Sequence, residues 1–65
     1  MKVRDAIKLV EADGWFLVGI RGSHRHFEHA TKAGKVTIPG PLSGDIPKGT
    51  LANILRQAQL KENKP

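Results

Sequence analysis

All three histidines of the chain lie within six residues, at His24, His26 and His29, directly after a Gly22-Ser23 pair. The charge of histidine changes nearer to neutral pH than that of any other side chain, so the cluster is a candidate for acid–base chemistry. The chain contains no cysteine and only one tryptophan. If the protein is a catalyst, its chemistry is expected in this segment.

Three interpretations of the cluster stay open at this point. In the first, the histidines are ordinary polar residues on a solvated strand. In the second they bind a metal, since His24 and His26 would lie about 7 Å apart on one face of a strand. Zinc requires three or four ligands at about 2 Å, and with no cysteine and no second paired motif a metal site is not expected. The third interpretation is acid–base catalysis on a phosphodiester.

Cleavage of RNA suits these residue types. A neutral imidazole can take the proton of a 2′-hydroxyl while that oxygen attacks the adjacent phosphate. Arg25, Lys35 and the hydroxyl and backbone amide of Ser23 are candidates to stabilise the charge that develops. This reaction needs no metal and no other cofactor. It does require RNA, because DNA lacks the 2′-hydroxyl.

The net charge of the chain is a second guide to its partner. Eleven Lys and Arg residues oppose six Asp and Glu, which gives a formal net charge of +5 and a pI of about 10.1. Such an excess of positive charge favours a polyanion such as RNA, or an acidic protein. There is no signal-peptide pattern after Met1 and no run of about 18 apolar residues, so a soluble cytoplasmic protein without a membrane partner is expected.

Hydrophobic periodicity and turn residues predict five elements in a single domain over residues 1–65. Apolar residues recur at helical spacing near both ends of the chain, and the runs between them are typical of strands. Gly14 is expected to end the first helix and Pro39 the last strand. The predicted elements are a helix over 2–13, a largely buried strand over 15–20, strands over 24–29 and 35–38, and, after an irregular loop over 40–48, a helix from Pro47 or Thr50 to about Leu60, with a frayed tail over 61–65.

This order predicts an α+β fold in which both helices pack on one face of a three-stranded antiparallel sheet. The other face of the sheet is then open to solvent or to a partner. Side chains alternate between the faces of a strand, so Phe27 should point toward the helices and His24, His26 and Glu28 toward the open face. Arg25 shares the parity of Phe27, as does His29.

The segment from Gly22 to His29 resembles the GSH-x-x-[FY]-x-H signature of the HicA toxins. Further landmarks of that family are matched in the same order along almost the whole chain, from Val3 to Leu60. They are Asp13-Gly14-Trp15, Val36-Thr37-Ile38-Pro39, Ile46-Pro47-Lys48-Gly49-Thr50-Leu51 and Ile54-Leu55-Arg56-Gln57-Ala58. A match of this extent is far more specific than clustered histidines.

The resemblance implies a double-stranded-RNA-binding-domain-like α-β-β-β-α fold. It also implies an mRNA interferase, the toxin of a type II toxin–antitoxin pair, that is neutralised by a HicB-type antitoxin. The catalytic histidine of the family falls on His24, and the glycine that forms the preceding turn falls on Gly22. The family's aromatic core position falls on Phe27, in agreement with the alternation of the strand.

Three positions depart from the family pattern. Ala30 stands where many relatives have proline, which should alter a turn and leave the chemistry alone. The loop over 40–45 lacks a histidine that some members have, so the acid for the leaving 5′-oxygen is left to His26 or to water. Gln59 stands where glycine usually ends the second helix, which predicts a longer helix here.

A different class of function is compatible with the same fold and the same basic residues, namely a non-catalytic RNA-binding module. Proteins that bind double-stranded RNA usually carry several lysines where their second helix begins. Here Lys48 is the only charged residue in that turn, which weakens this alternative. A third alternative is a protein that retains only the contact with its antitoxin.

Overall fold

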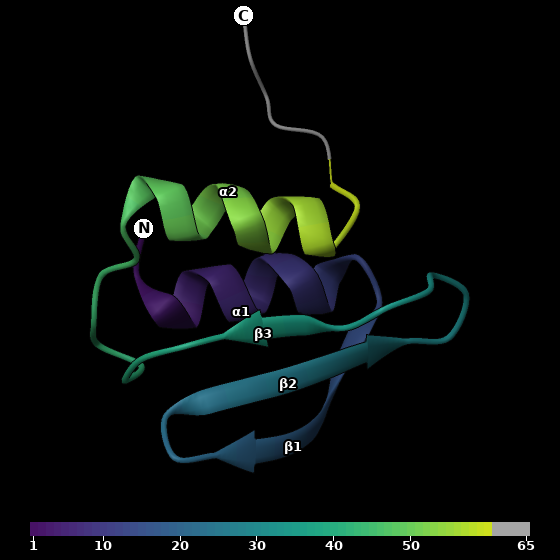
Figure 1. Cartoon of the computed structure of the whole chain (residues 1–65), viewed down its shortest axis with the longest axis horizontal. Helices are drawn as coiled ribbons and strands as arrows, with labels where there is room; N and C mark the ends of the chain where they lie inside the picture. The colour runs from purple at the N-terminus through teal and green to yellow at the C-terminus, as the bar shows by residue number, and fades with distance from the viewer. Residues whose placement is uncertain (61–65) are drawn as a thin grey trace, which may run out of the picture.

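The computed structural model describes residues 1–60, and the predicted fraying of 61–65 lies outside the described residues. The elements follow one another in the predicted order helix, strand, strand, strand, helix (Figure 1). They are α1 (Val3–Ala12), β1 (Trp15–Arg21), β2 (His24–His29), β3 (Val36–Ile38) and α2 (Lys48–Gln57). The α-β-β-β-α architecture is therefore confirmed, with β3 starting one residue later than predicted.

The three strands form one antiparallel sheet in the order β1-β2-β3. α1 packs against β1 and β3, and α2 packs against β3, so one face of the sheet is covered and the other is open. Phe27 lies in the centre of the covered face and is 1% exposed, which confirms its predicted place in the core. The other buried residues of this core are Val3, Ala6, Val10, Trp15, Val36, Ile38, Ile46, Ile54 and Ala58.

The loop before α2 supplies the hydrogen bonds that the start of α1 needs. No side chain caps this helix. Instead, the backbone N–H of Val3 donates to the carbonyl of Gly44 at 2.9 Å, and that of Arg4 donates to the carbonyl of Leu42 at 3.2 Å. Ile46 anchors the same loop in the core. The loop is irregular, as predicted. Its carbonyls accept hydrogen bonds from N–H groups at the start of α1, which have no acceptors within the helix.

α2 is shorter than predicted. It ends at Gln57, and Gln59 adopts a left-handed conformation with φ +56°. The N–H of Leu60 donates to the carbonyl of Leu55 at 2.9 Å, and the N–H of Gln59 donates to the carbonyl of Arg56 at 3.0 Å. This pair of bonds is the Schellman ending that glycine usually makes. The prediction that glutamine lets the helix run longer is therefore wrong, because Gln59 accepts the left-handed conformation in place of glycine.

The burial of β1 also differs from the prediction, which was a largely buried strand. Only Trp15 is buried, whereas Phe16, Leu17, Val18 and Ile20 are between 45% and 57% exposed. β1 is an edge strand, and Figure 1 shows it as the strand farthest from α2. A short apolar run is typical of a buried strand, but burial depends on the helices that cover it. Here they cover little beyond the first residue of β1.

Candidate catalytic site at the hairpin turn

β1 and β2 are joined by the predicted two-residue turn. Arg21 pairs with His24, and Gly22 and Ser23 lie between them. Gly22 has φ +56°, whereas Ser23, the other central residue of the turn, does not have a positive φ. A glycine with positive φ at the first central position is typical of a type II′ hairpin turn. The carbonyl of Ser23 accepts the N–H of Gly40 at 3.1 Å, which ties the turn to the chain after β3.

The side chains of β2 alternate between the two faces as predicted. The pairing of β1 with β2 is irregular between Leu17 and Gly19, but the extra residue lies in β1 and leaves the alternation of β2 unbroken. His24, His26 and Glu28 therefore share the open face, opposite in direction to buried Phe27. Two of the three histidines are brought onto one surface.

His24 is exposed at the first position of β2. Within residues 1–60 its imidazole has no hydrogen-bond partner. Its cross-strand partner is Arg21, also exposed, which places a cation beside the imidazole. Arg21 was not among the predicted site residues, although a two-residue turn after it fixes this pairing. We call Arg21, Gly22, Ser23 and His24 the turn site.

His26 lies one step further along the open face and is half-buried. Its Nδ1 lies 3.1 Å from Oγ1 of Thr37, its partner on β3. On the other side its partner on β1 is Gly19, which has no side chain. Neither Gly19 nor Thr37 was predicted as a site residue, because both depend on the strand register.

Arg25 lies on the other face from His24. It is half-buried, and its guanidinium donates to the carbonyl of Gly40 at 2.9 Å. Together with the bond between Ser23 and Gly40, this contact holds the segment that follows β3. The fold therefore does not place the guanidinium of Arg25 beside His24, where it was predicted to support the chemistry.

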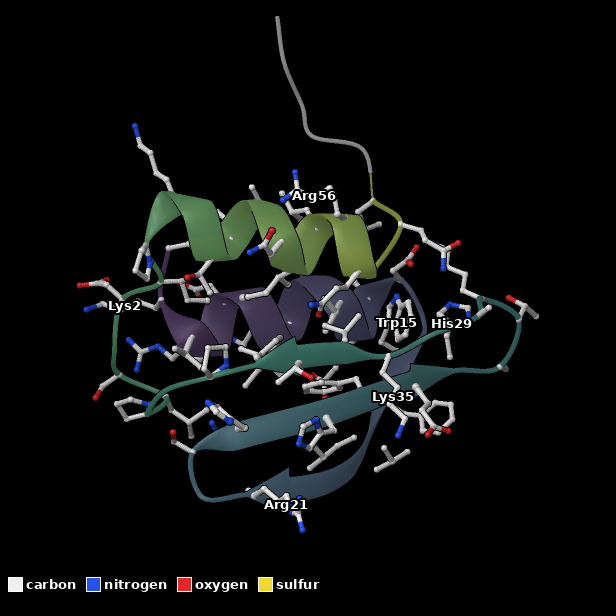
Figure 2. The ribbon with its side chains drawn as sticks, in the orientation of Figure 1. Lys2, Trp15, Arg21, His29, Lys35 and Arg56 are labelled. Carbon is white, nitrogen blue, oxygen red and sulfur yellow. The ribbon has the colours of Figure 1, made fainter. Side chains whose placement is uncertain are left out.

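Lys35 lies at the other end of the sheet from the turn site. It directly precedes β3, and the β2–β3 register continued by one residue sets it opposite Glu28. Glu28 is four residues from His24, which is about 13 Å along an extended strand. Figure 2 shows Lys35 at the same end of the sheet as Trp15 and His29, with Arg21 away from them. Lys35 is an exposed cation, but it does not adjoin His24.

The third histidine, His29, uses its ring in contacts that hold the fold together. Nδ1 of His29 accepts the backbone N–H groups of Thr31 at 3.0 Å and Lys32 at 3.1 Å, so the ring proton must reside on Nε2. Nε2 then donates to the carbonyl of Asp13 at 2.6 Å. The ring packs edge-on against Trp15, with centroids 5.2 Å apart. His29 thus joins the end of α1 to the turn after β2.

A salt bridge reinforces this contact. Nζ of Lys32 lies 2.5 Å from Oδ2 of Asp13, which also accepts the indole N–H of Trp15 at 3.2 Å. The hydrogen bond from Lys32 lowers the pKa of Asp13 below its ordinary value, partial burial opposes this shift, and the charge of Lys32 adds to it. Nζ of Lys32 also donates to the carbonyl of Ala58. We call Asp13, Trp15, His29 and Lys32 the His29 corner.

The open face is an exposed surface. Among residues 1–60 there is no enclosed pocket and no group of three potential metal-ligating side chains. No helix in this part of the chain is both long and apolar enough to span a bilayer. The turn site therefore offers an exposed imidazole whose cross-strand neighbour, Arg21, is an exposed cation.

A comparison with known protein families identifies the family of this chain. The family model described as "HicA toxin of bacterial toxin-antitoxin" matches residues 3–60 of the 65. The chain therefore belongs to the HicA toxin family of toxin–antitoxin systems. A toxin of this kind has an antitoxin partner. No curated protein matches the chain.

Proposed function

We propose that the protein is the toxin of a type II toxin–antitoxin pair and acts as a metal-independent endoribonuclease on mRNA in the cytoplasm. His24 is the acid–base residue. The observation that carries the proposal is the contrast within the cluster: His24 has an exposed and unbonded ring, whereas His29 uses both ring nitrogens in the fold. Membership of the HicA family supports it.

In this proposal the RNA backbone lies on the open face across the turn site. The imidazole of His24 accepts the proton of a 2′-hydroxyl, and that oxygen attacks the neighbouring phosphorus. The guanidinium of Arg21 stabilises the negative charge that builds on the phosphate oxygens, with the Ser23 hydroxyl beside it. His26 supports the transition state from the next position of the face. Lys35 binds RNA further along, and Arg25 acts indirectly by holding the loop at Gly40.

The antitoxin of this proposal is a HicB-type protein that covers the open face. An acidic surface on the antitoxin would complement a chain of net charge +5. RNA and antitoxin then compete for the same surface. The proposal for the partner fails if a toxin–antitoxin complex forms and RNA cleavage continues at the rate of the free toxin.

The direct test uses a long single-stranded RNA in EDTA, with fragments resolved on a denaturing gel. The purified protein is expected to cleave, and His24→Ala is expected to fold normally and lose at least about 100-fold in rate. Arg21→Ala should lose about tenfold. Arg4→Ala is the matched control, because it removes an exposed cation from α1, on the covered side of the sheet, and should cleave normally.

Three other outcomes have distinct meanings. Equal cleavage by the protein and by His24→Ala would place the chemistry elsewhere. Binding of RNA without cleavage by either would support the non-catalytic RNA-binding module. Neither binding nor cleavage would leave only the antitoxin contact as the retained function.

A further inference from the structure

A row of three residues crosses the open face next to His24. Gly19 of β1, His26 of β2 and Thr37 of β3 are partners in the sheet register. The imidazole in the middle of the row is half-buried, with a hydroxyl on one side and no side chain on the other. This arrangement differs from the turn site, where the histidine has no partner among the described residues.

The hydroxyl of Thr37 can fix which nitrogen of His26 exchanges protons. Oγ1 of Thr37 lies 3.1 Å from Nδ1 and can accept a hydrogen bond from it. The bond N–H···O at Nδ1 can exist both in the imidazolium and in the neutral ring. Nε2 is then the nitrogen that gains and loses the proton. A hydrogen bond at one ring nitrogen is the usual way in which the reactive nitrogen of a histidine is selected.

The position of Thr37 is itself well fixed. Its neighbours on β3, Val36 and Ile38, are both fully buried and anchor the strand in the core. The backbone N–H of Thr37 points to the outer edge of the sheet, where Oε1 of Gln57 accepts it at 2.9 Å. α2 therefore holds the strand that holds the hydroxyl. Such support is what a residue that orients a catalytic ring requires.

Gly19 keeps the other side of the imidazole accessible. A Cβ at this position would have no atom within 4 Å, so the space is open. Glycine inside a strand lowers β-sheet stability and often marks a place where a ligand approaches closely. Every other position of β1 except Arg21 carries an apolar side chain. The glycine thus leaves the side of His26 that faces β1 without a neighbouring side chain.

We propose that Gly19, His26 and Thr37 form the second proton-transfer site of the ribonuclease, with His26 as the general acid and Thr37 as its positioning residue. The inference rests on the function proposed above. The 2′-oxygen forms its bond to phosphorus and gives its proton to His24. The bond from phosphorus to the 5′-oxygen breaks, and that oxygen takes the proton from Nε2 of the His26 imidazolium. The products are a 2′,3′-cyclic phosphate and a 5′-hydroxyl, and water returns both histidines to their starting states.

The spacing of the two histidines fits this division of labour. Residues two apart on one strand face are separated by about 7 Å. The attacking and leaving oxygens of a phosphoryl transfer stand on opposite sides of phosphorus, roughly in line. A phosphate between the rings can therefore offer one of these oxygens to each imidazole. A proton donor is needed at the leaving side, because an alkoxide is a poor leaving group.

The test compares two leaving groups in one oligoribonucleotide. After the cleavage position of the protein is mapped, the RNA is synthesised with either the natural 5′-oxygen or a bridging 5′-sulfur at that position. A thiolate leaves without protonation, so the sulfur substrate does not need the acid. His26→Asn is expected to cleave the oxygen substrate at least about 100-fold more slowly and the sulfur substrate at nearly the normal rate. His24→Ala should lose activity on both.

Thr37 is tested with the same pair of substrates. Thr37→Val should slow cleavage of the oxygen substrate by about 3- to 10-fold, as expected for one lost hydrogen bond, and leave the sulfur substrate unchanged. Thr37→Ser keeps the hydroxyl and should restore the rate. The matched control is Thr31→Val, because Oγ1 of Thr31 lies 3.2 Å from Nδ1 of His29, the same kind of contact in the His29 corner. It should change neither rate.

The outcomes separate this inference from the function on which it rests. If the unaltered protein cleaves neither RNA, the ribonuclease proposal fails and the inference fails with it. If the protein cleaves both RNAs but His26→Asn slows both equally, or slows neither, the inference alone is overturned. Thermal unfolding of each variant identifies losses that come from the fold, and Thr37→Ser gives a second test that does not depend on His26→Asn being folded.

Discussion

The turn site and the His29 corner stand at opposite ends of the same short strand, yet their histidines have opposite environments. At the turn site, His24 is exposed and its ring has no partner among residues 1–60, while Arg21 lies across from it. In the corner, His29 bonds to three backbone groups and packs on Trp15. An exposed ring can meet a substrate, and a fully bonded ring holds the fold. Clustering in sequence therefore does not mean a shared role.

The two regions also differ in what their glycines do, and this difference gives the largest expected effect on stability. Gly14 has φ +101°, and a Cβ there would lie 2.7 Å from Nε2 of His29. Gly22 has φ +56°, and a Cβ there would meet no atom within 4 Å. Gly14→Ala should cost about 3 kcal/mol, from backbone strain plus displacement of the His29 ring, and Gly22→Ala about 1 kcal/mol, from strain alone.

Urea unfolding of both variants measures these free energies. Equal costs would show that the close approach of His29 to Gly14 contributes nothing beyond backbone strain. Packing would then not distinguish the environment of Gly14 from that of Gly22.

A smaller effect is expected from acid, and it belongs to the His29 corner alone. The bond from Lys32 lowers the pKa of Asp13 in the folded protein, so the folded state binds a proton less readily than the unfolded chain. The stabilisation is therefore present above the ordinary pKa of an aspartate and is lost as the pH falls through the lowered value. Asp13→Asn should flatten the fall of the melting temperature in this acid range, below about pH 4.

Asp45→Asn is the control for the acid experiment. Asp45 forms a salt bridge with Lys2 at 3.4 Å, but its side chain is 76% exposed. An exposed pair of this kind contributes little to stability. Melting curves recorded from pH 7 to pH 2 should show the same acid dependence for Asp45→Asn as for the unaltered protein. The same flattening in both variants would contradict the assignment to the corner.

The smallest effect concerns Gln59, whose backbone carbonyl contacts Lys32 of the His29 corner and whose side chain contacts the next residue, Ala33. Gln59 has φ +56°, which favours glycine, but its Nε2 donates to the carbonyl of Ala33 at 2.9 Å. Gln59→Ala loses this bond and keeps the strain, whereas Gln59→Gly loses the bond and relieves the strain. The glycine variant should be more stable than the alanine variant by about 1 kcal/mol in urea unfolding. No difference would mean that the left-handed residue is not strained.

The order of elements and the faces of β2 could be predicted from the sequence, because they depend on local periodicity and on turn residues. The pairing of Arg21 with His24 could also have been predicted from the two-residue turn. The exposure of β1 could not, since it depends on where the helices end up over the sheet. The contact of Arg25 with Gly40 depends on the path of a loop, and the distance of Lys35 from His24 depends on how the chain returns to pair with β2.

The end of α2 shows a different limit of prediction from sequence. Glutamine is a good helix former, so its presence near Leu60 favours a longer helix. The helix nevertheless ends at Gln57. Lys32 and Ala33, which are 27 and 26 residues away in the chain, bond to Gln59 and hold it in place. Contacts between distant segments thus override the local preference of one residue.

The most direct test of the division between the two regions is a paired measurement on His24→Ala and His29→Ala, of RNA cleavage in EDTA and of unfolding in urea. His24→Ala is expected to lose at least about 100-fold in cleavage with unchanged stability. His29→Ala should lose about 2 kcal/mol of stability and cleave at the normal rate at a temperature where it is folded. If His24→Ala is unstable, or if folded His29→Ala fails to cleave, the assignment of chemistry to the turn site and structure to the corner is wrong.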